Sequence, residues 1–209
     1  MLDRLVTDVS KLERWLMHQL WPGPLTILLP KTTDVPDLVT AGLPSVGVRW
    51  PSHRLAQELI ALTGHPIAAP SANRFGGISP TTAEHVFDQL GDRIDGIVDG
   101  GPCAVGLEST VVEVRDDTII VLRYGGVTVE TLSRIAPVEV DTAHVEKIAQ
   151  SSPGRLAKHY APATPLVICD DWPHAPAGHD VGALGFRAIP HAGRFGRVEI
   201  LSPRPSLAE

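Results

Sequence analysis

Short apolar runs alternate with helical patterns along the first two thirds of the chain. Apolar runs bounded by turn residues predict strands at 25–29, 46–50, 67–69, 96–98, 109–114 and 119–122. Apolar residues at three- and four-residue spacing predict helices at 11–20, between Ser52 and Gly64, at 81–90 and at 129–135. This alternation predicts an α/β fold with mixed strand order.

Capping and breaking residues indicate where these helices begin and end. Ser10 with Glu13, and Thr81 with Glu84, have the form of capping boxes. Ser52 is expected to cap the second helix, and Gly64 follows its last apolar residue. The first helix should end at Trp21, because two prolines follow within three residues.

The apolar pattern weakens after residue 136 and returns only near residue 165. We therefore expect a first domain at 1–136, a linker at 137–164 and a partial second α/β domain at 165–209, with strands at 165–169 and 181–186. The predicted linker carries Arg155, Lys158, His159 and Tyr160, side chains that can grip phosphate and stack on a base.

Composition excludes several classes of protein. The 209 residues are 43% hydrophobic and 20% charged, as in a globular domain, and the net charge of -6 disfavours nonspecific nucleic-acid binding. Cys103 and Cys169 form neither a CxxC pair nor a metal-ligand spacing, which favours a reducing compartment. No apolar run approaches the roughly 20 residues that cross a bilayer, and the start lacks a signal-peptide core. We expect a soluble, cytoplasmic protein without a membrane partner.

Several loop motifs combine residues that break regular structure with residues that bind polar ligands. In chain order they are Trp21-Pro22-Gly23-Pro24-Leu25-Thr26, Val46-Gly47-Val48-Arg49-Trp50-Pro51, Ala69-Pro70-Ser71-Ala72-Asn73, Ser79-Pro80-Thr81, Asp99-Gly100-Gly101, Glu108-Ser109-Thr110-Val111, Leu122-Arg123 and Lys158-His159-Tyr160-Ala161-Pro162. Together they resemble the motifs of the threonylcarbamoyl-AMP synthase family, in its longer, two-domain type. The resemblance implies a YrdC-like twisted open α/β sheet, followed by a linker and an incomplete Rossmann-like α/β domain.

The resemblance also implies a reaction. The family joins L-threonine, bicarbonate and ATP into threonylcarbamoyl-AMP and pyrophosphate, for threonylcarbamoyladenosine in transfer RNA. Mg²⁺ would arrive with ATP, and the partners would include RNA, with double-stranded RNA binding, and the downstream tRNA threonylcarbamoyl transfer machinery. The chain has neither a Gly-x-Ser-x-Gly elbow nor a Cys-His signature, in keeping with a reaction that needs no covalent nucleophile. No catalytic residue is assigned.

Three residues are expected to bind L-threonine. Arg49 ends an apolar strand, so its guanidinium can leave the sheet edge and form two parallel hydrogen bonds with a carboxylate. By resemblance, Arg49 holds the threonine carboxylate, Ala69 contacts threonine through its backbone, and Ser109 binds it with a side-chain hydroxyl. The plainer interpretations are a surface ion pair for Arg49 and a glycine-rich hairpin around Ser109.

Seven residues are expected to bind ATP by the same resemblance: Ser45, Ser71, Asn73, Ser79, Arg123, His159 and Tyr160. The turn after Pro70 would present hydroxyl, amide and backbone N–H groups, although an ordinary Ser/Asn turn explains it equally well. Ser79 could instead serve only as part of a helix cap. His159 and Tyr160 would close the linker over the nucleotide, or would simply pack the linker onto the domain.

Other features qualify this interpretation. Members of the family open with a Pro-Thr-Glu-Thr-like strand and a Lys-x-Arg pair, and this chain has neither, so we expect an N-terminally truncated fragment with impaired activity. His174, His179 and His191 lack the spacing of a zinc site. Two alternatives are a non-catalytic nucleotide- or RNA-binding module and a carbamoyl-transfer enzyme of the hydrogenase-maturation type, whose zinc-finger and acylphosphatase modules are not seen in the sequence.

Overall fold

The computed structural model describes residues 1–141, 164–169, 176–186 and 188–201. The chain divides into two compact units, Met1–Pro162 and Ala163–Glu209, and each is described by itself. Within the described part of the chain, no helix has both the length and the apolar character needed to cross a bilayer.

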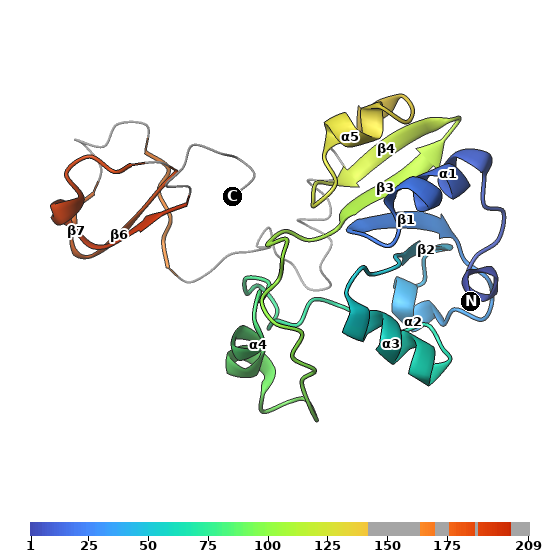
Figure 1. The fold of residues 1–209 in the computed structure, drawn as a ribbon, viewed down its shortest axis with the longest axis horizontal. Helices are drawn as coiled ribbons and strands as arrows, with labels where there is room; N and C mark the ends of the chain where they lie inside the picture. The colour runs from blue at the N-terminus through green and yellow to red at the C-terminus, as the bar shows by residue number, and fades with distance from the viewer. Residues whose placement is uncertain (142–163, 170–175, 187, 202–209) are drawn as a thin grey trace. The chain divides into compact units, whose positions relative to one another are not determined.

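A twisted sheet of five strands forms the centre of the first unit (Figure 1). Its spatial order is β2-β1-β3-β4-β5, and the pairs β1/β2 and β3/β4 are antiparallel whereas β1/β3 and β4/β5 are parallel. The strands are β1 Leu25–Pro30, β2 Ser45–Val48, β3 Thr110–Arg115, β4 Thr118–Arg123 and β5 Val138–Val140. The expected α/β fold with mixed strand order is confirmed.

Short helices complete this unit. They are η1 Leu2–Arg4, α1 Lys11–Leu20, α2 Asp37–Thr40, α3 Arg54–Thr63, α4 Ala83–Leu90 and α5 Val129–Ser133. The capping box of α1 is formed as predicted, since Ser10 Oγ accepts from Glu13 N at 3.2 Å and Glu13 Oε2 accepts from Ser10 N at 2.6 Å. The helix ends before Trp21, as the following prolines predict.

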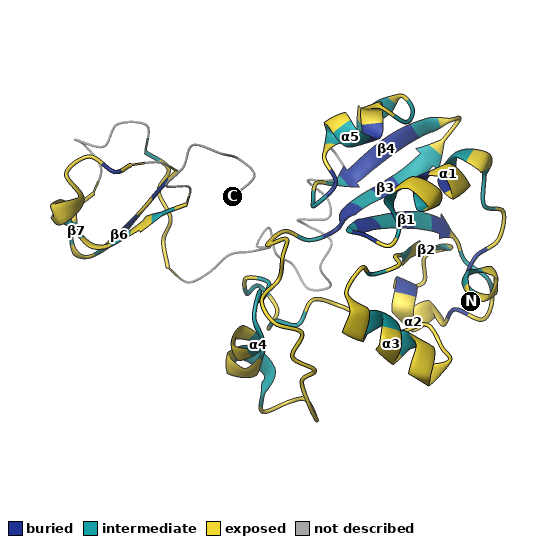
Figure 2. Ribbon diagram, in the orientation of Figure 1, coloured by how far each residue is buried: buried dark blue, intermediate teal, exposed yellow. Residues whose placement is uncertain are grey.

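The core lies where the sheet meets α1 and α5. Alternate residues of β1 (Leu25, Ile27 and Leu29) are fully buried, as expected for a strand with one face on a core. Leu16 of α1 and Leu132 of α5 join the same buried cluster. By contrast, α3 and α4 contain no buried residue, and Figure 2 shows both as mostly exposed.

Several predicted elements are wrong. Residues 67–69, 96–98 and 165–169 form no strand, and Ile67, Val98 and Leu166 are exposed at 43%, 68% and 83%. A run of three to five apolar residues becomes a strand only when a neighbouring strand satisfies its backbone, and none pairs with these runs in the described residues.

Two helix starts also differ from the prediction. Helix α3 is preceded by His53 rather than Ser52, and its N-cap makes no side-chain hydrogen bond. Helix α4 is capped one residue later than expected, because Thr82 Oγ1, not Thr81, accepts from His85 N. Strand β5 lies within the predicted linker and pairs with β4, which shows that the apolar pair Val138 and Val140 belongs to the sheet.

The second unit is described in part. Strands β6 Gly178–Gly185 and β7 Phe195–Ile200 pair in parallel, with the short helix η3 Ala192–Arg194 ahead of β7. The strand predicted at 181–186 therefore exists, with an earlier start. Strand β7 was not predicted, although Val198 and Ile200 alternate with polar residues, a pattern typical of a half-buried strand.

Candidate functional site

Arg123 and Ser109 meet at one end of the β3/β4 hairpin. Arg123 ends β4, and the antiparallel register sets it opposite Val111, close to the start of β3. Its Nε and Nη2 donate to the Ser109 carbonyl at 3.1 and 2.9 Å, and Nη2 also donates to Ser109 Oγ at 3.1 Å. The Ser109 hydroxyl lies 2.7 Å from Thr26 Oγ1 of β1. Strands β1 and β4 and the residue just ahead of β3 therefore contribute to one polar cluster.

Glu108 extends this cluster to the loop ahead of α4. Its Oε2 lies 2.6 Å from Arg123 Nη1, and its Oε1 accepts from Ser79 Oγ at 3.0 Å. We define the polar cluster as Thr26, Ser79, Glu108, Ser109 and Arg123. Sequence reasoning included Ser79, Ser109 and Arg123 among the candidate site residues and missed Thr26 and Glu108. Both of these lie inside the family-like motifs, so the motifs carried a signal for them.

Glycine at position 125 permits the close packing behind this cluster. A Cβ at Gly125 would collide with backbone atoms of Glu108, Ser109 and Thr110. The neighbouring Gly126 N donates to the Glu108 carbonyl at 2.9 Å. The Tyr124-Gly125-Gly126 turn thus supports the backbone from which Glu108 and Ser109 project.

Arg49 lies next to this cluster. The β1/β2 register pairs Val48 with Ile27, which sets Arg49 just past the end of β2 beside Thr26. Partial desolvation, and then the positive charge of Arg123, lower the pKa of Arg49 from its usual value. Arg49 nevertheless keeps much of its surface exposed to solvent. Within the described residues Arg49 has no hydrogen bond or ion pair. Two nearby guanidinium groups of this kind favour an anionic ligand.

The loop ahead of α4 contains three further candidates. The Asn73 Nδ2 donates to the carbonyls of Arg74 and Gly77 at 2.9 and 3.2 Å, while its Oδ1 is buried without a partner in the described part of the chain. Asn73 therefore shapes its own turn and keeps one acceptor unused. Ser71 and Ala69 are exposed and lie outside any strand.

Ser45 is set apart from these residues. It lies at the start of β2 opposite Pro30, whereas Arg49 follows the other end of that strand, about 13 Å away at the usual rise of a strand. Ser45 borders a depression lined with the carboxylates Asp8, Glu113, Asp116 and Asp117. A negatively charged depression of this kind does not favour phosphate. The structure therefore does not bring Ser45 together with the polar cluster.

His159 and Tyr160 lie outside the described residues. Among the residues that the structure describes, no group of three or more His, Cys, Asp or Glu side chains could hold a metal ion.

Two family models cover almost the whole chain. The Sua5/YciO/YrdC model, described as "Telomere recombination", matches residues 1–125, and the model of the threonylcarbamoyl-AMP synthase C-terminal domain matches residues 127–205. The chain belongs to the threonylcarbamoyl-AMP synthase family. The resemblance found in its motifs, including the two-domain type, is thereby confirmed.

Curated relatives carry the same name. The threonylcarbamoyl-AMP synthase of Bacillus subtilis is 46% identical over an alignment of 181 residues, and the match covers 80% of this chain and 52% of the relative. The Pyrococcus abyssi enzyme is 38% identical over 172 residues, which are 81% of this chain and 51% of the relative. The chain spans about half the length of these relatives.

Solved structures confirm the YrdC-like fold. Pyrococcus abyssi Sua5 complexed with L-threonine matches with a TM-score of 0.64 at 32% identity, over 88% of this chain and 50% of that chain. Escherichia coli YciO matches with a TM-score of 0.53 at 29% identity, over 62% of this chain and 63% of that chain.

Proposed function

We propose that this chain binds the substrates of an L-threonylcarbamoyladenylate synthase, which converts L-threonine, bicarbonate and ATP to threonylcarbamoyl-AMP and pyrophosphate for tRNA threonylcarbamoyladenosine formation. The observation that carries the proposal is the meeting of Arg123, Glu108, Ser109 and Ser79, with Arg49 beside them. These residues come from motifs of the family to which the chain belongs.

L-threonine is the substrate that the geometry supports most directly. Arg49 would hold its carboxylate, because a guanidinium without a hydrogen-bond or ion-pair partner among the described residues is available for a bidentate contact. The Ser109 hydroxyl, which is held between Thr26 and Arg123, would accept or donate a hydrogen bond to the same ligand. Ala69 would contribute its backbone. The relative from Pyrococcus abyssi that was solved with L-threonine supports this choice of substrate.

ATP would bind across the loop ahead of α4. Arg123 would contact a phosphate or the ribose, Ser79 and Ser71 would offer hydroxyl groups, and Asn73 would offer its Oδ1, which has no partner among the described residues. Mg²⁺ would come with the nucleotide, because it often binds through substrate phosphates and water. Ser45, His159 and Tyr160 remain predictions from the family resemblance alone.

The chemistry asked of these residues is positioning and charge stabilisation. The threonine amine adds to bicarbonate with loss of water to form a carbamate, whose oxygen then displaces pyrophosphate from the α-phosphorus of ATP. Cationic groups fixed near the reacting phosphate stabilise the charge that develops there. Arg49 and Arg123 are the cations that the described site supplies. The product would pass to the tRNA threonylcarbamoyl transfer machinery, and RNA is a further proposed partner in the cytoplasm.

Two measurements test this proposal. Isothermal titration calorimetry of the chain should show binding of L-threonine and of Mg²⁺-ATP, and pyrophosphate release should require L-threonine, bicarbonate and ATP together. Binding of both ligands with little pyrophosphate release would fit the impaired activity expected of this chain. Release that stays absent when a family-type Pro-Thr-Glu-Thr-like strand and Lys-x-Arg pair are supplied would favour the alternative of a non-catalytic nucleotide-binding module. A chain that binds neither ligand would contradict the proposed function.

A further inference from the structure

Gln89, in the last turn of α4, bridges the two ends of a turn in the preceding loop. Its Oε1 accepts from the Arg74 backbone N–H at 3.2 Å, and its Nε2 donates to the Ile78 carbonyl at 3.2 Å. Asn73 closes the same turn from within through the carbonyls of Arg74 and Gly77. The segment 73–78 is therefore fixed by one side-chain amide on each side.

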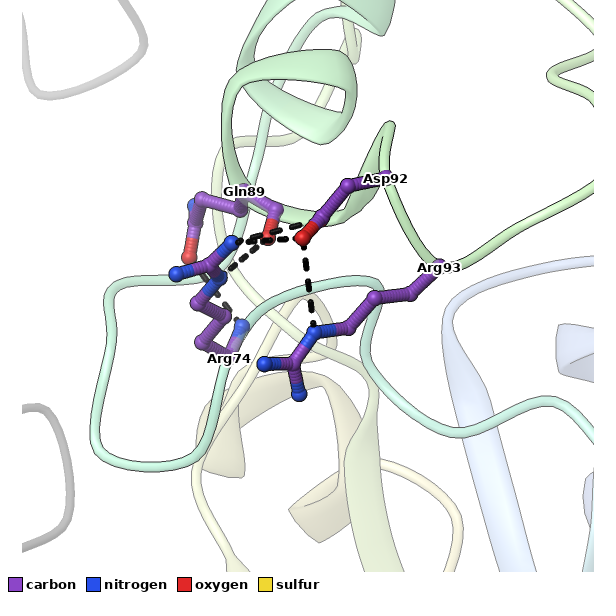
Figure 3. A network of polar contacts seen from close by, with 4 residues as sticks. All are labelled: Arg74, Gln89, Asp92 and Arg93. Atoms are coloured by element: carbon purple, nitrogen blue, oxygen red, sulfur yellow. Dashed lines mark hydrogen bonds and ion pairs between the residues drawn. The ribbon is translucent and has the colours of Figure 1, made fainter.

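The Arg74 side chain in turn contacts the C-terminal end of α4. Its Nε donates to the Gln89 carbonyl at 2.6 Å, and its Nη2 lies 3.2 Å from Asp92 Oδ1 (Figure 3). The side chains of Arg74 and Asp92 are 53% and 63% exposed, so their ion pair contributes little. The backbone bonds made by the Gln89 amide, rather than the charges around it, define the turn.

Gly77 provides independent evidence that the turn packs closely against the Gln89 side chain. A Cβ there would lie 2.8 Å from Gln89 Oε1 and 3.0 Å from the Arg74 carbonyl, closer than side chains normally pack. The preceding Gly76 has a φ of +79°, which glycine adopts without strain. The Gly-Gly pair lets the turn fold against Gln89.

The bridge leads directly to the proposed site. Ile78, whose carbonyl Gln89 holds, precedes Ser79, and Ser79 donates to the Glu108 carboxylate that pairs with Arg123. We propose that Gln89 is a positioning residue, which sets Ser79 and Asn73 at the distance at which they contact the nucleotide. The inference rests on the proposed function, because it assigns a role within the same site.

Calorimetry on the whole chain tests the inference with Mg²⁺-ATP and L-threonine as separate probes. Gln89→Ala removes two hydrogen bonds to the loop backbone, and we expect ATP affinity to fall by about 10-fold. Gln89→Glu should weaken ATP binding as well, because a carboxylate cannot donate to the Ile78 carbonyl. Gly77→Ala should also weaken ATP binding, because the added Cβ would displace the Gln89 side-chain amide. L-threonine affinity should be unchanged in all three, since no hydrogen bond or ion pair joins Arg49 or Ser109 to residues 73–78 within the described part of the chain.

Asp92→Asn is the matched control, since it removes the exposed ion pair and leaves the Gln89 amide in place; ATP affinity should stay at the original value. Gln89→Ala and Gly77→Ala variants that bind ATP as tightly as the unsubstituted chain would overturn the positioning role alone. Equal losses of ATP and L-threonine affinity would also overturn it, because they would mark a general structural role. An unsubstituted chain that binds neither probe would overturn the proposed function, and this role with it.

Discussion

Arg123 Nη1 lies 2.6 Å from Glu108 Oε2, and the two side chains are 33% and 23% exposed. The guanidinium is thus held by a partly buried carboxylate from one side and by the Ser109 carbonyl and hydroxyl from another. A held arginine presents its remaining N–H groups in a fixed direction, at little conformational cost on binding. Its charge is shared with Glu108, whereas that of Arg49 is not shared within the described residues. The two arginines are therefore suited to different ligand groups.

Arg123→Ala should weaken Mg²⁺-ATP binding by about 1.5–3 kcal/mol, the usual contribution of hydrogen bonds to charged groups. Arg115→Ala is a matched control, because Arg115 ends β3 at the opposite end of the same hairpin and forms an ion pair with Glu113 there. Calorimetry of both variants beside the unsubstituted chain measures the difference. If the two substitutions had equal effects on ATP affinity, Arg123 would lose its place in the site.

Arg49→Ala should reduce L-threonine affinity by a similar amount, about 1.5–3 kcal/mol, with a smaller effect on ATP. The reason is that Arg49 lies beside Thr26, near the positive charge of Arg123, and has no hydrogen-bond or ion-pair partner within the described residues. Arg54→Ala serves as the control, since Arg54 pairs with Glu58 on the exposed face of α3. Titration with L-threonine and with its methyl ester separates the carboxylate contact from the rest. An ester that binds the original chain as well as threonine does would contradict this role.

The sequence predicted the parts of the fold that depend on interactions between residues close together in the chain. The capping box of Ser10 and Glu13 and the stop at Trp21 act within a few residues, so α1 could be placed at both ends. The short apolar run at 25–29 likewise predicted a strand, and alternate residues of that strand, β1, are buried. The apolar run at 67–69 failed as a prediction, because strand formation depends on a partner distant in sequence.

The sequence likewise predicted the candidate site only in part. Its residues could be listed from motifs, but which of them meet depends on strand register. The antiparallel β3/β4 register joins Arg123 to Ser109, and the β1/β2 register separates Ser45 from Arg49 by the length of a strand. Glu108 contacts Ser79 and Arg123, which are 29 and 15 residues away in sequence, so no local pattern could reveal its place. Whether these residues bind ATP and L-threonine stays a prediction.

Thr110→Val should lower the free energy of unfolding by about 1–3 kcal/mol, because it leaves buried backbone groups unpaired. Thr110 is 1% exposed, and its hydroxyl donates to the Val127 carbonyl at 2.6 Å and accepts from the Val127 N–H at 2.9 Å. Ser133→Ala is the control, since its hydroxyl makes one exposed bond to the Val129 carbonyl. Urea unfolding followed by circular dichroism measures both, and equal changes would show that the Thr110 bridge is not important for stability.

Ser10→Ala should lower the free energy of unfolding by about 0.5–2 kcal/mol, the usual effect of losing a helix N-cap. The substitution removes the acceptor for Glu13 N but keeps the reciprocal bond from Ser10 N to the Glu13 carboxylate. Ser10→Thr, which retains the hydroxyl, should lose much less and is the control. Because Leu16 of α1 is fully buried in the core, fraying of this helix exposes core surface and should lower the urea midpoint of the whole first unit. A loss of helical signal without a shift of that midpoint would mean that α1 unfolds independently of the sheet.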